Sequence, residues 1–336
     1  MEIILQNLLS PIILFFILGI VASLFKSDLS FPSGLSEALS IYLLIAIGIK
    51  GGIELSNYSF QTVITPLAGT LFLGILTPVL TLMILKVFFK MDLHNAIGLA
   101  ATYGSVSIVT YGAAIAFLGD FGVSYESFMS AMVVVMEIPA ILVALILFGM
   151  AQSKKKQQEM PVQGVGIVAQ SPIPLIDKSI LRESFFGKSV LLLLGSLLVG
   201  LVTGEDAIPV VQPLFMDMYY SVLILFLLNM GLIAGKRLSV IKEHGIKLIS
   251  LGVVIPVVYG VLGIVTGYVV GLSQGGATLM GVLAASASYI AAPAALRASV
   301  PKANPSIYLG LALGITFPFN LIVGIPLMYA ISQWFY

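Results

Sequence analysis

Ten stretches of this sequence are almost continuously apolar and long enough to cross a bilayer as helices, which takes about 20 residues each. They cover residues 3–25, 37–55, 62–89, 95–118, 124–150, 188–204, 211–234, 246–272, 276–299 and 305–334. Only 9% of the 336 residues are charged, whereas a soluble domain has about 25%. The apolar runs do not alternate with polar residues, so they predict helices rather than barrel strands. The sequence therefore predicts an all-α membrane protein with ten transmembrane helices and not a soluble enzyme.

The basic residues predict how these helices are oriented. When the N-terminus is placed outside, fifteen of the sixteen Lys and Arg residues fall on the inner side, and only Lys50 falls on the outer side. Because cytoplasmic loops are rich in Lys and Arg, we expect a multi-pass protein of the cell inner (plasma) membrane with both termini outside. The polar stretch 151–187 is then a cytoplasmic linker. It is either a flexible tether or a docking site for a regulator or anionic membrane lipid.

The chain contains an internal duplication. Similar residues recur at nearly constant offsets in the pairs Gly98 and Gly281, Pro78 and Pro256, and Pro139 and Pro318. We interpret residues 1–150 and 188–336 as two five-helix repeats. An odd number of helices per repeat makes the second copy insert upside down, which is a common architecture of secondary transporters. The sequence has no Gly-rich phosphate-binding signature, so it does not predict an ATP-driven pump.

The fourth and ninth segments contain small and hydroxylated residues at their centres. Pro293 predicts that the ninth segment breaks near 288–292, because proline removes a donor and clashes with the preceding turn. Gly104, Ser105 and Ser107 indicate an equivalent break in the fourth. Exposed amides at the start of a half-helix bind an anion without a basic side chain, and unwound carbonyls can hold Na⁺. The alternative is that these small residues only allow close helix packing.

Glu137 is the one carboxylate placed well inside an apolar segment. Pro139 frees the carbonyl of Val135 nearby, and a carboxylate beside a free carbonyl suits Na⁺ or H⁺. Thr316 occupies the equivalent position in the second repeat, and Asn320 follows one turn later. Alternatively, Glu137 is protonated and hydrogen-bonded to a neighbouring helix, and the other two are interhelical fasteners.

The composition excludes several kinds of site. There is no cysteine, which excludes disulfides and thiolate chemistry, and there are two histidines, His94 and His244, both near segment ends. We therefore expect no cofactor other than sodium as a coupling ion. The net charge of +1 gives no reason to expect a nucleic-acid partner.

Several motifs resemble one transporter family. Residues 296–310 resemble the signature that ends the cyanobacterial-type sodium-dependent bicarbonate transporters. Residues 124–126, followed by 137–140, resemble that family's fifth span, and residues 104–107 and 284–288 resemble its two half-helix motifs. The resemblance covers nearly the whole chain except the linker.

The resemblance implies two inverted five-helix repeats with helices four and nine broken. The first two helices of each repeat would form a gate domain, and the other three a moving core. It also implies a homotrimer, a PII-like cytoplasmic regulator, and sodium-coupled import of bicarbonate by an elevator-like mechanism. Alternatives are sodium- or proton-coupled transport of another small anion, or a membrane sensor or scaffold.

The resemblance also implies which residues bind the cargo. The expected anion-binding residues are Gly104, Ser105, Val106, Ser107, Thr110, Ser286, Ala287, Ser288, Tyr289 and Ala291. The expected sodium ligands are Ser105, Ser107, Glu137, Ser288, Thr316 and Asn320. In one departure from the family pattern, Tyr289 stands where the family has a carboxylate.

Overall fold

The computed structural model describes residues 2–32, 34–159, 186–241 and 245–336, and these residues form helices with no β-strand. The first half contains α1 (Glu2–Leu8), α2 (Pro11–Leu24), α3 (Leu35–Ser56), α4 (Phe60–Val87), α5 (Leu93–Gly104), α6 (Ile108–Asp120) and α7 (Met129–Glu159). The second contains α9 (Lys188–Thr203), η1 (Gly204–Ala207), α10 (Ile208–Val211), η2 (Gln212–Asp217), α11 (Tyr219–Ile241), α12 (Ile246–Val269), α13 (Gln274–Ala285), α14 (Ala291–Ser299), α15 (Pro305–Leu311), η4 (Ala312–Thr316), α16 (Phe317–Phe319), η5 (Asn320–Gly324) and α17 (Ile325–Ser332). Most of the predicted linker, residues 160–185, lies outside the described residues.

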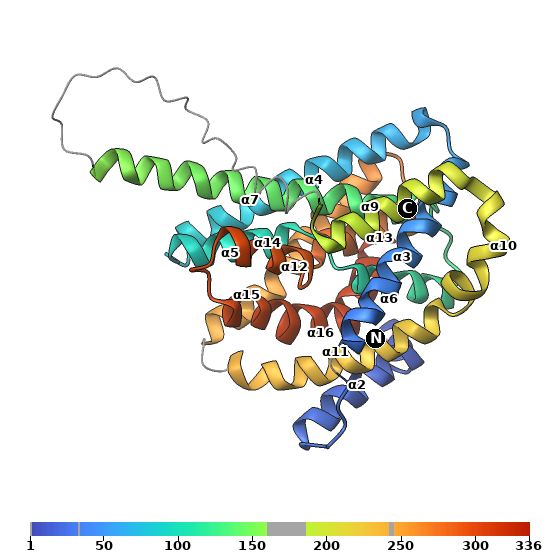
Figure 1. Cartoon of the computed structure of the whole chain (residues 1–336), viewed down its shortest axis with the longest axis horizontal. Coiled ribbons are helices and arrows are strands. Elements are labelled where there is room, and N and C mark those ends of the chain that lie inside the picture. Colours follow the sequence, from blue (N-terminus) through green and yellow to red (C-terminus); the bar gives the residue numbers. More distant parts are fainter. Residues whose placement is uncertain (1, 33, 160–185, 242–244) are drawn as a thin grey trace.

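Within the described ranges, seven helical stretches are long and apolar enough to cross a membrane. One of them, Lys188–Arg237, has 50 residues. A straight helix of that length would measure about 75 Å, more than twice the bilayer core of about 30 Å. The chain instead reverses its direction between α9 and α11, through η1, α10 and η2 (Figure 1).

The first predicted segment, residues 3–25, is wrong as one continuous helix. The structure divides it into α1 and α2. Ser10 caps the new helix, since its Oγ accepts a hydrogen bond from the Ile13 amide at 3.4 Å, and Pro11 takes the first helical position. Proline is favoured there because its missing amide proton has no partner in a first turn. Helix α2 is apolar, but with 14 residues it is shorter than the seven stretches and is not one of them.

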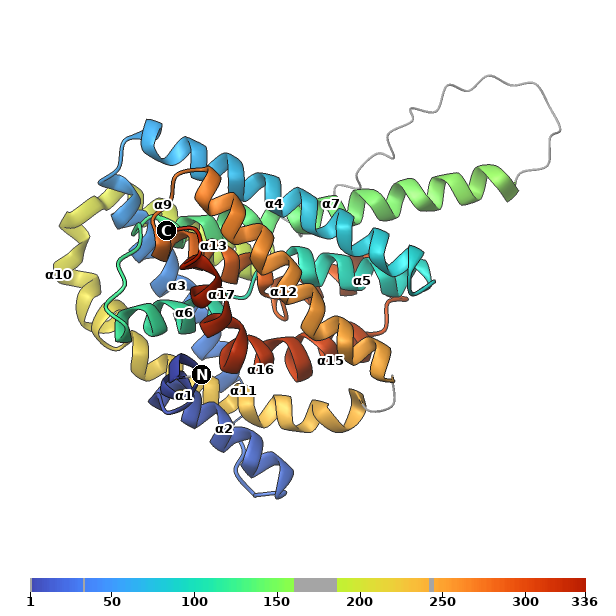
Figure 2. The same ribbon diagram turned by 180° about the vertical axis from the view of Figure 1, so that it is seen from behind.

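The molecule has a fully buried centre. Every residue from Ala96 to Leu118 is buried, and so is every residue of 275–285, so α5, α6 and α13 form the middle of the molecule. Helices α4 and α12 lie outside them (Figure 2). These two helices expose apolar side chains such as Phe72 and Val254. An apolar outer face is what a bilayer requires of a membrane protein.

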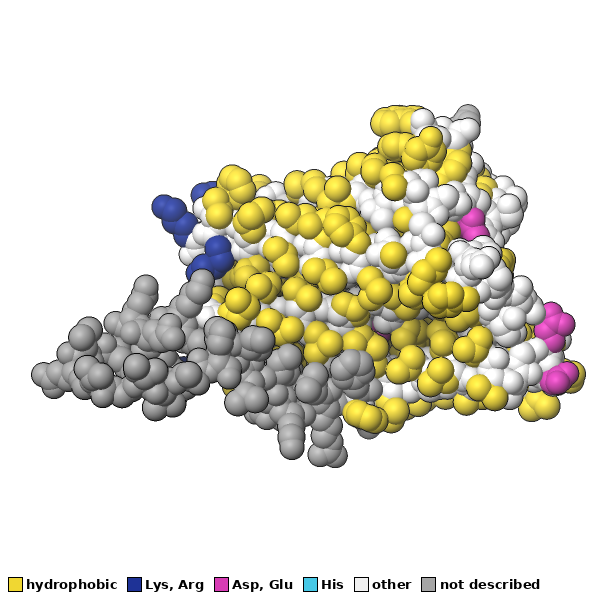
Figure 3. Space-filling view, turned by 90° about the horizontal axis from the view of Figure 1, so that it is seen from above, with side chains coloured by type: hydrophobic (Ala, Val, Ile, Leu, Met, Phe, Trp, Pro, Cys, Tyr) yellow, Lys and Arg dark blue, Asp and Glu magenta, His cyan; other side chains and the backbone are white. Residues whose placement is uncertain are grey.

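Charged side chains lie at the two ends of the long axis. In Figure 3, Lys and Arg gather at one end and Asp and Glu at the other, with hydrophobic side chains between them. Lys86 and Lys90 lie at the end of α4, whereas Glu205, Asp206 and Asp217 lie in the turn between α9 and α11. We call these the basic end and the acidic end.

Glycines bring the backbones of two helix pairs into contact. A Cβ on Gly200 of α9 would lie 2.2 Å from the Ile49 carbonyl oxygen of α3, and one on Gly52 would lie 2.1 Å from the Leu197 carbonyl oxygen. The pair α2 and α11 repeats this arrangement, because a Cβ on Gly231 would lie 2.1 Å from the Phe16 carbonyl oxygen. Small residues allow such close approach, which favours van der Waals packing between membrane helices.

We expect Gly200→Ala to destabilise the protein by about 1–3 kcal/mol, the usual effect of overpacking, because the new methyl group must displace the α3 backbone. Gly195→Ala on the same helix is the matched control, since nothing lies within 4 Å of its Cβ position. Thermal unfolding of the purified protein in detergent measures both variants. Equal melting temperatures for the two would contradict the packing described above.

Candidate functional site

The first helix break lies between α5 and α6. Helix α5 ends at Gly104, where a Cβ would meet Pro78 of α4 at 2.9 Å. The Thr77 hydroxyl donates to the Gly104 carbonyl at 3.3 Å, which satisfies one of the acceptors left at the helix end. Ser107 then caps α6, because its Oγ accepts hydrogen bonds from the Thr110 amide at 3.2 Å and the Thr110 hydroxyl at 2.9 Å.

The second break lies between α13 and α14. Helix α13 ends at Ala285 and α14 begins at Ala291, so the interruption begins two residues before the predicted range. Ser288 Oγ accepts a hydrogen bond from the Ala292 amide at 3.2 Å at the start of α14. A continuous helix would bring Pro293 against the carbonyl of Tyr289, which explains why it ends before that point.

Two hydrogen bonds join these breaks. The Ser107 amide donates to Ser286 Oγ at 2.9 Å, and the Ser288 amide donates to the Thr102 carbonyl at 2.8 Å. Each break therefore satisfies a polar group of the other. Two amides that could have bound an anion are used in this way. The amides of Ile108 and Val109, in the first turn of α6, have no acceptor within the helix by their position.

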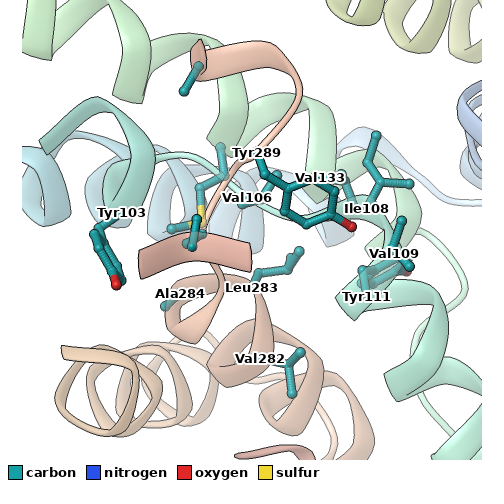
Figure 4. Packing of buried hydrophobic residues seen from close by; sticks show 14 of the residues in the cluster. Tyr103, Val106, Ile108, Val109, Tyr111, Val133, Val282, Leu283, Ala284 and Tyr289 are labelled. Atoms are coloured by element: carbon teal, nitrogen blue, oxygen red, sulfur yellow. The ribbon is translucent and has the colours of Figure 1, made fainter. Parts of the chain in front are cut away.

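A small pocket lies beside the joined breaks, and we call it the central pocket. It is lined by Leu44, Val106, Ser107, Ile108, Glu137, Ser189, Ser288, Tyr289 and Ile290. Its volume is about 10 Å³, the space of a single water molecule. The Tyr289 ring extends toward Ile108 (Figure 4) and packs edge-on against Phe317 at 5.3 Å between ring centroids.

Two polar atoms of the pocket lining are buried without partners. Glu137 Oε2 and Tyr289 Oη have no hydrogen-bond partner among the described residues, and neither has Ser105 Oγ at the first break. Glu137 is only 3% exposed, and burying an unpaired carboxylate is costly. No cluster of three or more His, Asp or Glu that could hold a metal ion occurs in the described part of the chain. A cation in this pocket would therefore rely on Glu137 together with hydroxyl and carbonyl oxygens.

A larger cavity of about 300 Å³ lies on the basic side of the central pocket, and we call it the basic-end cavity. Lys188 and Arg297 line it, and Ser189, Tyr289 and Ile290 line both spaces. The central pocket therefore adjoins the basic-end cavity through these three shared residues. Lys188 also pairs with Glu37 of α3.

The structure distributes the predicted site residues unevenly. Val106, Ser107, Glu137, Ser288 and Tyr289 line the central pocket, and Ala291 lines the basic-end cavity. Gly104, Ser105, Thr110, Ser286 and Ala287 are buried at the two breaks without lining either space.

Two of the predicted sodium ligands are engaged with other helices. The Thr316 hydroxyl donates to the Gly252 carbonyl at 2.7 Å and shares a 2.6 Å hydrogen bond with the Tyr103 hydroxyl. The Asn320 amide group donates to the Ala285 carbonyl at 2.8 Å, at the end of α13. The contacts of Thr316 are those of an interhelical fastener. Asn320 keeps Oδ1, the atom that could bind Na⁺, buried without a partner among the described residues.

Leu44 and Ser189 line the central pocket but were not expected there. Both come from helices that carry no break, α3 and α9. Ser189 is the second residue of its helix and lies outside the small-residue runs, so no local pattern distinguishes it.

Glu126 positions the helix that leads to the second break. Its carboxylate accepts hydrogen bonds from the Ser273 amide at 2.6 Å and the Ser273 hydroxyl at 3.0 Å, at the N-terminus of α13. A carboxylate is stabilising at a helix N-terminus because of the positive end of the helix dipole. A Cβ on Gly275 would lie 2.1 Å from the Ser124 carbonyl oxygen, so the chain before α7 packs tightly on this terminus.

We expect Glu126→Ala to lower the free energy of unfolding by about 1–2 kcal/mol, because α13 loses a charged partner at its N-terminus. Glu126→Gln should retain part of this stability. Glu205→Gln is the control, since that carboxylate accepts one exposed hydrogen bond from Asn57. Thermal unfolding in detergent compares the three, and an effect of Glu126→Ala no larger than that of the control would contradict the positioning role.

Comparison with known proteins identifies the family of the chain. The family model described as the Na⁺-dependent bicarbonate transporter superfamily matches residues 11–333. No curated protein matched the chain. The family match spans both helix breaks, the central pocket and the basic-end cavity. The chain therefore belongs to the Na⁺-dependent bicarbonate transporter superfamily.

Proposed function

We propose that this protein is a secondary active transporter that imports bicarbonate together with Na⁺ across the plasma membrane. The observation that carries the proposal is the central pocket, which lies between two joined helix breaks and contains buried polar atoms without partners. The family to which the chain belongs supports the identity of both cargo ions.

The anion would bind at the start of α6. The amides of Ile108 and Val109 and the positive end of the helix dipole attract negative charge there. Ser107 and Ser288 supply hydroxyl groups on the two sides of the pocket. Val106 and Tyr289 also line the pocket and would contact the ion. The expected residues that line neither space would shape the breaks instead, namely Gly104, Ser105, Thr110, Ser286 and Ala287.

Sodium would bind on the Glu137 side of the same pocket. The pocket would have to widen to hold both ions, because its volume in this conformation is that of about one water molecule. Na⁺ would neutralise the buried carboxylate and give its unpartnered oxygen a ligand. A neighbouring cation and anion would also stabilise each other in a medium of low dielectric constant. This mutual stabilisation is a physical basis for coupled transport, since each ion then binds more tightly when the other is present.

Alternating access would follow from relative movement of two groups of helices. The glycine-mediated pairs α2 with α11 and α3 with α9 would form the gate, and α4 to α7 with α12 to α17 would form the core. In the proposed ten-helix inverted repeat, these pairs would be equivalent. The basic end would face the cytoplasm by the positive-inside rule, with both termini outside. The central pocket adjoins the basic-end cavity, which fits a conformation open to the cytoplasm.

The proposed assembly is a homotrimer, with a PII-like regulator docking on the cytoplasmic linker. Exposed apolar side chains on the gate helices, including Leu198 and Val199 of α9, are available for contacts between copies or with lipid.

Purified protein in liposomes tests the proposed transport directly. We expect labelled bicarbonate to accumulate when an inward Na⁺ gradient is applied, and not when K⁺ replaces Na⁺. A sodium ionophore should abolish the accumulation by removing the gradient. Equal uptake with and without the Na⁺ gradient would contradict the proposal.

Glu137→Gln should raise the Na⁺ concentration for half-maximal uptake by about tenfold or more, equivalent to about 1.4 kcal/mol of lost ion binding. The reason is the removal of the one carboxylate in the central pocket. Asp28→Asn, at an exposed carboxylate, is the matched control. If Glu137→Gln retains the Na⁺ dependence of the unaltered protein, Glu137 is not a sodium ligand.

A further inference from the structure

A second polar pocket lies toward the acidic end, and no step of the proposed transport cycle uses it. Its volume is about 110 Å³, several times the space that one water molecule needs. Its polar lining consists of Lys50, Ser130, Tyr219 and Tyr220, and Ala46 and Ile115 belong to its apolar lining. We call it the acidic-end pocket.

The side chains in this pocket are suited to an anion. Lys50 supplies positive charge, and its side chain is 40% exposed. Tyr219 Oη is buried and has no hydrogen-bond partner among the described residues. Ser130 Oγ lies 3.2 Å from Tyr111 Oη, which orients this hydroxyl beside the pocket. A cation surrounded by hydroxyl donors is a common way to bind a small oxyanion.

Lys50 already has a weak partner. Its Nζ lies 3.8 Å from Glu54 Oε1, one turn further along α3. This distance exceeds that of a charge-assisted hydrogen bond, which is about 2.7–2.9 Å. Glu54 Oε2 is buried and has no partner within the described structure. The ammonium group has three donors, so it can make a closer contact with an incoming anion while it stays beside Glu54.

The acidic-end pocket is aligned with the central pocket along two helices. On α3, Leu44 lines the central pocket, and Ala46 and Lys50 line the acidic-end pocket. On α6, Ile108 lines the central pocket and Ile115 the acidic-end pocket, seven residues or about 10 Å further along the helix. No lining residue is shared between the two, so they are separate spaces in this conformation.

We propose that the acidic-end pocket is a second binding site for a small monovalent oxyanion, in which the Lys50 ammonium group donates to the ion while it stays beside Glu54. This inference rests on the proposed function, because it makes the acidic-end pocket the site where bicarbonate binds first from the outside, before it reaches the central pocket. Lys50 is the one basic residue that the charge distribution of the sequence leaves on the outer side.

Because the chain has no cysteine, one introduced thiol can report on this pocket. Ala46→Cys places the thiol one turn from Lys50 on the same face of α3. The full-length variant in liposomes is reacted separately with an anionic and with a cationic methanethiosulfonate, and the rate of thiol modification is measured. Each reaction is run once in chloride and once in bicarbonate, at equal ionic strength. Val210→Cys, at a position 82% exposed near the acidic end, is the control for accessibility.

We expect the anionic reagent to react faster than the cationic one at Ala46→Cys, by about tenfold, because local positive charge concentrates anions. Bicarbonate should slow the anionic reagent at least twofold relative to chloride, and should not slow it at Val210→Cys. Adding Lys50→Met together with Glu54→Gln should remove both the preference for the anionic reagent and the protection by bicarbonate. Glu54 is replaced as well so that no unpaired carboxylate is left. Lys50→Arg should preserve them.

Two results would overturn the inference. One is the absence of protection by bicarbonate in Ala46→Cys. The other is protection that persists after Lys50→Met and Glu54→Gln, since the ion would then act from elsewhere. Uptake measured on the same liposomes separates the two proposals. Protection of the thiol without Na⁺-dependent uptake supports the anion site and contradicts the transport proposal. Na⁺-dependent uptake without protection of the thiol supports the transport proposal and contradicts the anion site.

Discussion

Buried backbone groups need hydrogen-bond partners, and this requirement governs the centre of the molecule. A membrane interior offers no water to an interrupted helix, so non-helical backbone persists there only where protein or a cavity satisfies it. Here the two interruptions satisfy each other through the Ser107 amide with Ser286 Oγ and the Ser288 amide with the Thr102 carbonyl. Each break therefore depends on the other, and both depend on the helices that hold them together.

The surrounding helices supply hydrogen bonds that hold the two breaks in place. Helix α4 contributes the Thr77 hydroxyl to the end of α5, and Asn320 binds the last carbonyl of α13. Glu126 fixes the other end of α13 through Ser273. The breaks are thus supported from both halves of the chain. What remains without a partner, chiefly Glu137 Oε2 and Ser105 Oγ, lies beside them and marks where ions would complete the structure.

Much of this arrangement follows from local sequence patterns. Continuous apolar runs are enough to predict most of the helices. Pro293 and the residues at 104–107 are enough to predict the two interruptions, because glycine, serine and proline change the backbone conformation at their own positions. The division of 3–25 at Ser10 and Pro11 is equally local, but it is hidden inside an otherwise apolar run.

Long-range geometry is harder to predict. Ser189 and Leu44 reach the central pocket only because α9 and α3 pack alongside the breaks. In the same way, the sequence predicts that Thr316 is the equivalent of Glu137, but Thr316 bonds to Gly252 and Tyr103 on neighbouring helices. A matching position in the sequence does not determine which partner a side chain meets.

The central claim is that the space between the two joined breaks holds the cargo ions. A cryo-EM map of the protein with saturating sodium bicarbonate, compared with one recorded in potassium chloride, tests it most directly. The account predicts new density against the first turn of α6 and beside Glu137, within the lining of the central pocket. Well-resolved density for both breaks with no added feature between them would contradict it.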